Sequence, residues 1–225
     1  MKAKMEFVSS NQRIPFRCQK CAKCCRELED SLMLEPLDVF RLTQYMMKTD
    51  TGIEGAEDVL GRYAHPNTLN GYPIFQVNTI GADHTCVFLK EGRCSVYDAR
   101  PMVCRMYPFG VAPGERGKAF NYYLSTERGH HFGNGSVRVK DWFSDNLSRD
   151  AKDFYKEEYK VLPVLGRTIK RIGEKGFARI AFQLLYYLYY GYDYDKPFVP
   201  QYSRNMEALC KALEKETGRE ELCSP

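Results

Sequence analysis

Residues 18–25 read Cys-Gln-Lys-Cys-Ala-Lys-Cys-Cys and place four cysteines within eight residues. In a tight turn, a spacing of three residues brings the sulfur atoms toward one point. Thiolates are soft ligands, and a group of four selects zinc or an iron–sulfur centre over magnesium or calcium. The stretch therefore predicts a metal-binding knuckle.

Three further cysteines follow the knuckle before residue 110: Cys86, Cys94 and Cys104. The chain begins with charged and polar residues and lacks the apolar core of a signal peptide, which favours a cytoplasmic location. Cysteines clustered in that reducing compartment hold metal more often than they form disulfides. The other two cysteines, Cys210 and Cys223, are predicted to be a helix core residue and a tail residue.

The seven clustered cysteines can be grouped in more than one way. Adjacent Cys24 and Cys25 project in different directions, so they are not expected to close one tetrahedral zinc site together. A four-cysteine site plus an open three-cysteine site, or two metals that share a thiolate, would use all seven. Alternatively, the spacing of Cys18, Cys21 and Cys24 matches ferredoxin-type runs, with a distant ligand such as Cys104. The sequence favours a [4Fe–4S] type of cluster and leaves Zn2+ open.

Three other residues near the cysteines are candidates for supporting roles. Arg100 and Arg105 would offset the negative charge of a thiolate cluster and donate hydrogen bonds around it. The alternative is that they pair with Asp98 or Glu91 at the surface. His84, two residues before Cys86, is a candidate extra ligand, and the alternative for it is a solvated loop position.

The first half of the chain alternates short predicted helices and strands. Pro36 and Asp38 suit the first turn of a helix that extends to Met47. Two apolar runs around Lys90-Glu91-Gly92 predict a β-hairpin with a cysteine on each arm. Phe7, Ile14 and Phe16 in the lead-in are expected to pack against the cluster. The remaining predicted elements of this half are a helix over 57–64, a strand over 72–80 and a helix over 98–109 that contains Cys104.

A glycine-rich segment, residues 110–117, is the predicted boundary between residues 1–110 and residues 111–225, although the two parts could form one continuous domain. Helical patterns dominate beyond it. The tyrosines of residues 186–194 predict either a helix end packed under its own loops or a partner surface. The predicted elements are strands over 119–124 and 136–139, and helices over 148–161, 164–173, 176–190 and 203–217.

Composition limits the classes of partner. The 225 residues are 44% hydrophobic and 28% charged, as in a folded globular protein, and the net charge is +4. Residues 1–110 hold 14 Lys and Arg against 13 Asp and Glu, interleaved, which predicts no nucleic-acid binding. The apolar run over 177–190 is too short for a membrane span and contains Arg179 and Gln183. A protein partner or protein substrate is left as the expected partner class.

The full pattern resembles a known family. It comprises Cys-x-x-Cys-x-x-Cys-Cys, then Cys-x-Phe-Leu with a second cysteine before Val-Tyr, then Arg-Pro-x-x-Cys-Arg-x-Tyr-Pro-Phe. This combination, over residues 18 to about 110, is similar to the CxxCxxCC family of zinc- or iron-chelating domains, which includes the flagellin lysine N-methylases. The resemblance implies that the seven cysteines are ligands: Cys18, Cys21, Cys24, Cys25, Cys86, Cys94 and Cys104. It also implies that Arg100, Pro101, Arg105 and Pro108 frame them.

The expected protein is therefore α+β: a small cysteine-rich metal-binding domain with a β-hairpin, packed against a mainly helical C-terminal half. Its expected function is to hold an iron–sulfur cluster or zinc through seven cysteines. Two alternatives stay open. One is a methyltransferase-like enzyme acting on protein lysine, implied by the resemblance, and the other is a metal-delivery or cofactor-assembly partner.

Overall fold

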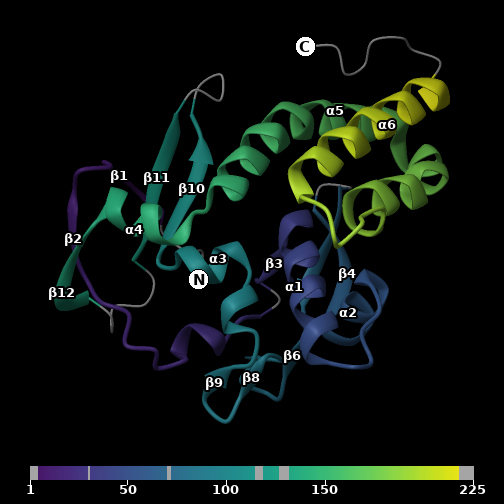
Figure 1. Cartoon of the computed structure of the whole chain (residues 1–225). Coiled ribbons are helices and arrows are strands. Elements are labelled where there is room, and N and C mark those ends of the chain that lie inside the picture. Colours follow the sequence, from purple (N-terminus) through teal and green to yellow (C-terminus); the bar gives the residue numbers. More distant parts are fainter. Residues whose placement is uncertain (1–4, 30, 70–71, 115–118, 127–131, 218–225) are drawn as a thin grey trace.

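The computed structural model describes residues 5–29, 31–69, 72–114, 119–126 and 132–217 (Figure 1). The N-terminal segment pairs with strands that lie beyond residue 110. β1 (Met5–Val8) forms the edge of an antiparallel sheet of order β1-β11-β10, with β10 (Phe109–Pro113) and β11 (Phe120–Ser125). β2 (Arg13–Phe16) pairs with β12 (Phe132–Arg138), so strand pairing joins the two predicted parts of the chain.

A second sheet lies beside two helices in the middle of the molecule. Its order is β3-β5-β4, and its strands are β3 (Met33–Leu34), β4 (Ala64–Leu69) and β5 (Tyr72–Val77). The helices are α1 (Pro36–Thr49) and α2 (Ala56–Tyr63), close to the predicted bounds. Pro36 opens α1 as predicted, and Asp38 completes a capping box with Glu35, because its carboxylate accepts from the Glu35 N–H at 3.2 Å.

The cysteine-bearing elements are short. They are η1 (Lys23–Cys25), β6 (Thr79–Ile80), β7 (Thr85–Cys86), β8 (Leu89–Lys90), β9 (Arg93–Cys94), η2 (Tyr97–Ala99) and α3 (Met102–Met106). The predicted hairpin is the β8–β9 pair, whose turn holds Glu91 and Gly92 at positive φ, as a type I′ turn requires. Only Cys94 lies on an arm of this hairpin. Cys86 lies in β7, which pairs with β6, so the prediction of a cysteine on each arm is wrong.

The C-terminal half is helical, as predicted, but its helices are fewer and longer. It contains α4 (Val139–Asn146), α5 (Arg149–Leu185), the π-helical turn η5 (Tyr186–Tyr190) and α6 (Phe198–Thr217). Three predicted helices are thus one continuous run, and Pro163 lies inside α5. The packing of α5 against α6 explains this, because the buried side chains of Leu165, Ile169 and Ile180 outweigh the local cost of proline and glycine.

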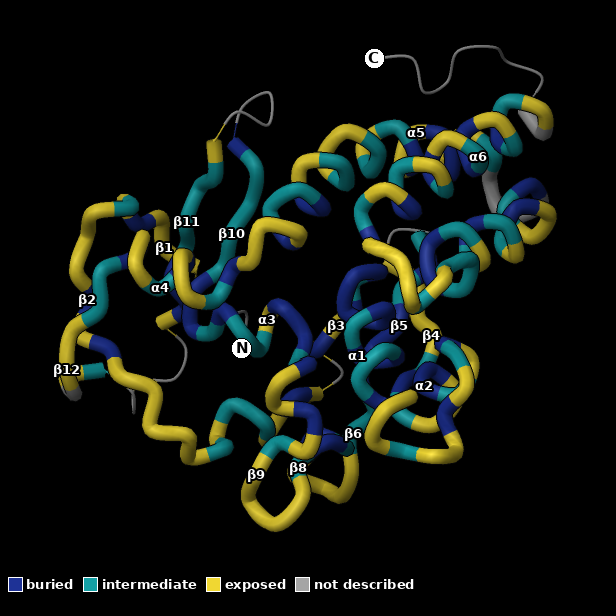
Figure 2. The backbone as a smooth tube through the Cα atoms, in the orientation of Figure 1, coloured by how far each residue is buried: buried dark blue, intermediate teal, exposed yellow. Residues whose placement is uncertain are grey.

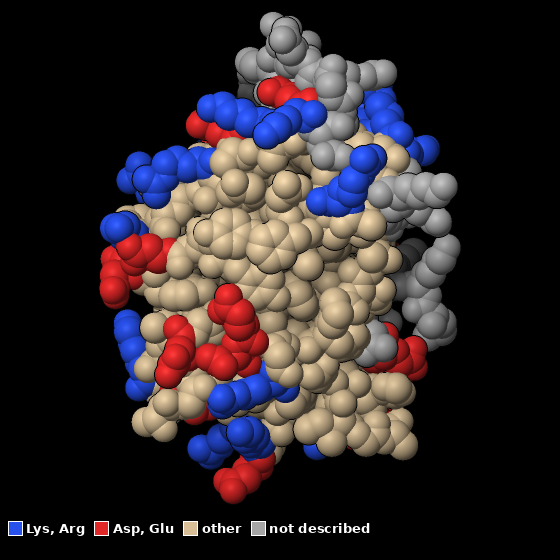
Figure 3. Space-filling model, turned by 90° about the vertical axis from the view of Figure 1, so that its right-hand side faces the viewer, with Lys and Arg blue, Asp and Glu red and all other residues tan. Residues whose placement is uncertain are grey.

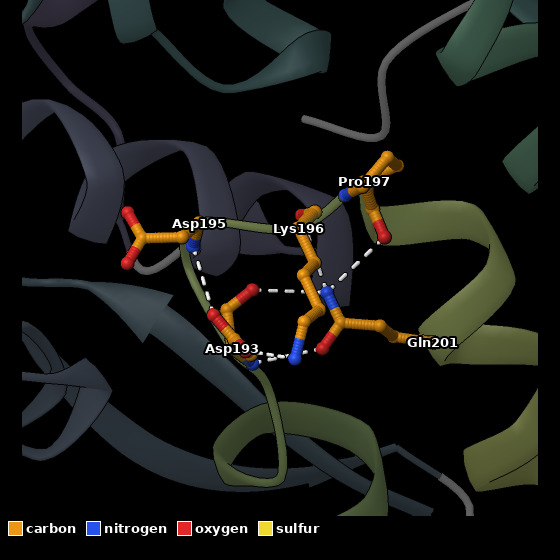
Figure 4. Close-up of polar contacts among 5 residues, drawn as sticks. All are labelled: Asp193, Asp195, Lys196, Pro197 and Gln201. Carbon is orange, nitrogen blue, oxygen red and sulfur yellow. Dashed lines mark hydrogen bonds and ion pairs between the residues drawn. The ribbon is translucent and has the colours of Figure 1, made fainter.

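The loop between η5 and α6 is clamped by one buried side chain (Figure 4). The Gln201 amide nitrogen donates to the carbonyls of Asp193, Lys196 and Pro197, while its oxygen accepts from the Asp193 N–H at 2.8 Å. The Lys196 ammonium pairs with the Asp193 carboxylate at 2.6 Å. The loop therefore holds α6 in a defined direction relative to η5.

One hydrophobic cluster runs through both halves of the chain, and buried segments follow it from the strands to the C-terminal helices (Figure 2). Phe16 is buried against Phe109 and Trp142, whereas Phe7 is 67% exposed, so the prediction that Phe7 packs against the cysteines is wrong. Tyr189 is buried, and most of the neighbouring tyrosines pack partly buried on the core, which favours the packed helix end.

Cys210 is buried on α6, as predicted. It is also disulfide-bonded, which was not predicted from the sequence. Cys223 lies outside the described residues. The mixed helix and strand content, with small sheets and a helical C-terminal half, confirms the α+β prediction.

Figure 3 shows the face at the right-hand side of Figure 1. Charged side chains of both signs lie mainly along its margins and leave a broad area without Lys, Arg, Asp or Glu. None of the helices in the described part of the chain combines the length and apolar character needed to cross a membrane.

Candidate metal centre

The knuckle backbone is held in an unusual conformation. Lys20 and Ala22 have φ angles of 53° and 57°, in the left-handed region that costs a non-glycine residue about 1–2 kcal/mol. All non-glycine residues with positive φ in the described ranges lie in the two cysteine-bearing segments: Lys20, Ala22, Glu27, Glu29, His84 and Glu91. Strain of this kind persists where surrounding interactions determine the backbone, and it concentrates at functional sites.

Backbone hydrogen bonds dock the knuckle onto the turn before β7. The Glu27 N–H donates to the Asp83 carbonyl at 2.8 Å, and the Leu28 N–H donates to the His84 carbonyl at 3.2 Å. The Arg26 guanidinium adds an ion pair with the Asp83 carboxylate at 3.0 Å, about half exposed on both sides. A segment near residue 25 and one near residue 85 are thereby brought side by side (Figure 1).

Cys86 and Cys94 lie where backbone N–H groups point at their sulfur atoms. Burial raises the pKa of Cys86, and the N–H groups of Phe88 and Leu89, which donate to its sulfur, partly offset that rise. Burial likewise raises the pKa of Cys94, which receives an N–H from Val96. Hydrogen bonds from backbone N–H groups stabilise the thiolate form that binds metal. Burial outweighs these donors, so the pKa of both thiols stays raised, and a bound cation would reverse that balance.

Cys104 is positioned by contacts at both ends of α3. At the first turn, the buried Asp38 carboxylate accepts from the Met102 N–H at 2.8 Å and so links α3 to the start of α1. At the last turn, the Trp142 indole N–H donates to the Met106 carbonyl at 3.0 Å. Cys104 lies inside this helix, as predicted, and burial together with the charge of Cys86 raises its pKa.

Five thiols are thereby gathered from four elements: Cys24, Cys25, Cys86, Cys94 and Cys104. The pKa of Cys25 is raised by a hydrogen bond with the Cys24 thiol, by burial, and by the charges of Cys24, Cys104 and Cys86. Thiolates this close repel one another in a poorly solvated space. A bound cation would remove that penalty, because it favours the deprotonated form of every ligand.

The other two predicted cysteine ligands are placed differently. Cys18 and Cys21 are exposed on the stretch before η1, and the candidate extra ligand His84 is exposed on the turn before β7. Within the described ranges, no group of three or more His, Cys, Asp or Glu side chains already stands in position to hold a metal ion. Ligation would therefore require the cysteine-bearing loops to close further around the metal.

Arg100 and Arg105 lie against the same elements. The Arg100 guanidinium stacks over the Tyr97 ring, 4.0 Å from its centroid, and its charge opposes the rise that burial causes in the pKa of Cys94. Arg105 donates to the backbone carbonyl of Asp98, and neither arginine forms an ion pair with a carboxylate in the described part of the chain. Arg100 therefore lies where its charge acts on Cys94, whereas the charges that act on Arg105 are those of Arg100, Arg41, Asp38 and Asp98, and its charge-offsetting role stays a prediction.

Replacing Arg105 with alanine is expected to accelerate metal loss about tenfold, because outer-shell partners of metal ligands contribute on that scale. The rate of metal transfer to a coloured chelator measures it. Arg93→Ala is the matched control, since Arg93 is exposed beside Cys94 as Arg105 lies beside Cys104. Equal rates for both variants would leave Arg105 with no role in metal retention.

A group of acidic side chains lies behind the cysteines and was not predicted from the sequence. Asp38 on α1 is buried, Glu35 at the N-cap of α1 and Glu158 on α5 are half-buried, and the buried Tyr155 on α5 lies beside them. Burial raises the pKa of Asp38 to about 6 and that of Glu158 to about 8, and it raises the pKa of Glu35 well above its ordinary value. In the sequence these residues look like ordinary helix acids, so only the packing of α5 against α1 reveals them.

The stability of the folded chain is expected to fall as pH rises from 5 to 8. Glu158 has a pKa of about 8 when folded and an ordinary value of 4.5, so the folded state holds the proton more tightly. Its stabilising contribution is complete below pH 4.5 and is lost as pH rises through 8. Glu158→Gln should remove much of this dependence and raise the free energy of unfolding at pH 8 by on the order of 2 kcal/mol.

Urea denaturation at pH 5 and pH 8 measures that difference. Glu157→Gln is the control, because Glu157 pairs with Lys160 at 2.7 Å on the helix surface and carries the same charge change. If the free energy of unfolding of both variants depends on pH as it does in the parent protein, proton binding by Glu158 does not cause that dependence.

Comparisons with known proteins are consistent with this site. Residues 17–127 match the family model CxxCxxCC, described as a putative zinc- or iron-chelating domain. An uncharacterized protein from Methanocaldococcus jannaschii is 28% identical over 139 residues, which cover 60% of this chain and 68% of that protein. No solved structure matches the chain significantly.

Proposed function

Because residues 17–127 belong to the CxxCxxCC family of zinc- or iron-chelating domains, we propose that this chain is a cytoplasmic metalloprotein whose cysteines hold an iron–sulfur cluster or zinc. The observation that carries the proposal is the gathering of five thiols from η1, β7, β9 and α3. η1 lies far before β7, β9 and α3 in the sequence, yet the cysteines of all four elements interact with one another, which scattered core cysteines would not do.

The donor set fits such a group. Its sulfur ligands are soft, and two of them receive backbone N–H bonds. When bound, zinc would supply a structural crosslink or a Lewis acid, and an iron–sulfur cluster would supply electron transfer. The chain itself orients Cys104 through Asp38 and Trp142, and it holds the knuckle on β7 through the backbone of Glu27 and Leu28.

Purification without oxygen, followed by absorption spectroscopy and analysis for zinc, iron and acid-labile sulfide, tests the proposal. The spacing of the cysteines favours a [4Fe–4S] type of cluster, which predicts brown protein with iron and sulfide in equal amounts. Colourless protein with stoichiometric zinc would support the zinc form. Protein that contains neither metal and takes up neither during reconstitution would contradict the proposal.

The Cys18→Ser variant tests whether the exposed end of the knuckle supplies metal ligands. A site that uses all seven cysteines predicts a large loss of metal from this variant. Full metal content in a folded Cys18→Ser protein would remove Cys18 from the ligand set. Cys18 is exposed, so the substitution leaves the core unchanged, and circular dichroism provides the folding control.

A second candidate function is delivery of metal to a protein partner, and the exposure of Cys18 and Cys21 favours it. An exposed Cys-x-x-Cys pair beside a buried group of thiols offers an incoming partner a place to begin ligand exchange. Metal transfer from the loaded protein to an apo acceptor peptide should then slow strongly in Cys21→Ser. The methyl transfer implied by the resemblance stays a prediction, and calorimetric titration with S-adenosylmethionine tests it.

A further inference from the structure

A cavity of about 440 Å³ lies where α1, η2, α3 and the junction between α4 and α5 meet. Figure 1 shows α3 between α1 and α4. The volume is within the range of pockets that take small molecules. Three basic side chains line the cavity, Arg41 and Lys48 from α1 and Arg105 from α3, and none of the thiols does.

The Arg41 guanidinium is held in place by neutral partners. Its Nη2 donates to the Ser148 hydroxyl at 2.7 Å, and its Nη1 lies 3.0 Å from the Met102 sulfur. Within the described ranges, no carboxylate lies at ion-pair distance from it. Its position is therefore fixed by neutral hydrogen-bond partners, and the Asp38 carboxylate acts on it only from beyond ion-pair distance, so the guanidinium can still pair with an anion.

The Arg105 guanidinium is only partly satisfied. One of its terminal nitrogens donates to the Asp98 carbonyl, but its buried Nε has no hydrogen-bond partner. Arg41 and Arg105 are also close enough for their charges to repel each other. A buried donor without a partner costs about 1–3 kcal/mol. An oxyanion in the cavity would relieve the repulsion between Arg41 and Arg105.

The N-terminal end of α5 adds to the positive electrostatic potential in the cavity. Ser148 is the N-cap of this 37-residue helix, and its hydroxyl accepts from the Ala151 N–H at 3.3 Å. The N-terminus of a helix carries partial positive charge and favours anions. The cavity therefore combines two guanidinium groups, an ammonium group at its rim and a helix N-terminus.

Two carboxylates, from Asp98 and Asp145, also line the cavity and select the rest of the ligand. They reject a highly charged polyanion and can accept hydrogen bonds from hydroxyl or amino groups. We propose that this cavity binds a small molecule that carries one phosphate or carboxylate group together with hydrogen-bond donors. Asp98 lies four residues after Cys94, and Arg105 is the residue next to Cys104. A ligand in the cavity would therefore contact the elements that hold these two thiols.

Calorimetric titration of the metal-loaded protein with inorganic phosphate, and separately with acetate, tests this inference at constant ionic strength. Saturable binding of phosphate or of acetate identifies the oxyanion class. Arg41→Gln should weaken that binding by about tenfold or more, the scale of a charge-assisted hydrogen bond. Arg149→Gln should leave anion binding unchanged. This substitution removes the same charge one residue beyond Ser148, but the Arg149 side chain is 94% exposed.

Metal content and circular dichroism of each variant separate loss of the anion site from loss of the metal centre or the fold. If Arg41→Gln fails to fold, Lys48→Gln at the exposed rim provides the second variant and should weaken binding several-fold. Absence of saturable binding by both anions would overturn the inference. Equal weakening by Arg41→Gln and Arg149→Gln would also overturn it, since that result reports only net charge.

Discussion

Cys104→Ser is expected to lose most of its metal, with the affinity lowered on the order of 100-fold or more, beyond the loss from an outer-shell change. A serine hydroxyl does not deprotonate near neutral pH and is not a soft ligand, so the metal would keep one donor fewer. The Cys104 thiol lies in the interior with Cys86, Cys24 and Cys94 as charged neighbours, so solvent offers no equivalent replacement. Metal analysis after gel filtration measures the loss.

Val103→Ser is the matched control for this variant. Val103 precedes Cys104 on α3, is 51% exposed, and should keep its full metal content after the same change to serine. Equal metal content in the two variants would show that Cys104 is not a ligand. Loss from both would point to a disturbed α3 helix, and Cys104→Ala would then separate the helix from the thiolate.

Removal of the metal is expected to loosen the two cysteine-bearing segments before the rest of the chain. Metal binding stabilises the folded state by about 2.7 kcal/mol when the free metal is 100 times its dissociation constant. Residues 18–29 and 83–105 hold only short helical turns and two-residue strands, and they contain every non-glycine residue with positive φ in the described ranges. Without metal, little else offsets this strain.

Hydrogen exchange followed by mass spectrometry, before and after chelator treatment, measures this effect. Amides of residues 18–29 and 83–105 should exchange much faster in the apo protein, while amides of the buried α5–α6 pair should change little. Chelator already saturated with zinc is the control for binding of the chelator itself. Unchanged exchange in both segments would mean that the metal does not stabilise these loops, and uniform acceleration would mean that it stabilises the whole fold.

The local elements were predictable because their signals are short in range. Pro36 and Asp38 open α1 as expected, and Glu91-Gly92 forms the turn of the β8–β9 hairpin. Cys104 lies inside a helix, also as expected. Capping, turn chemistry and hydrophobic periodicity act over a few residues, so they can be read directly from the chain.

Long-range packing overruled some of these local signals. The sequence predicted separate helices over 148–161, 164–173 and 176–190, yet α5 continues through Pro163 because its buried face packs against α6. Cys86 lies on β7 rather than on an arm of the β8–β9 hairpin, because its strand partner is Thr79 on β6. Burial of an apolar surface contributes more than local propensity when the two conflict.

The cysteine pattern by itself determined which residues could bind metal and which two metal classes suit them. Only the tertiary structure separated five partly or fully buried thiols from the exposed Cys18 and Cys21. Only the tertiary structure also brought the Asp38 carboxylate of α1 to the first turn of the helix that carries Cys104. The physical reason is the range of each effect. Ligand chemistry belongs to the individual side chain, whereas burial, charge repulsion and cavity shape arise when segments far apart in the sequence meet.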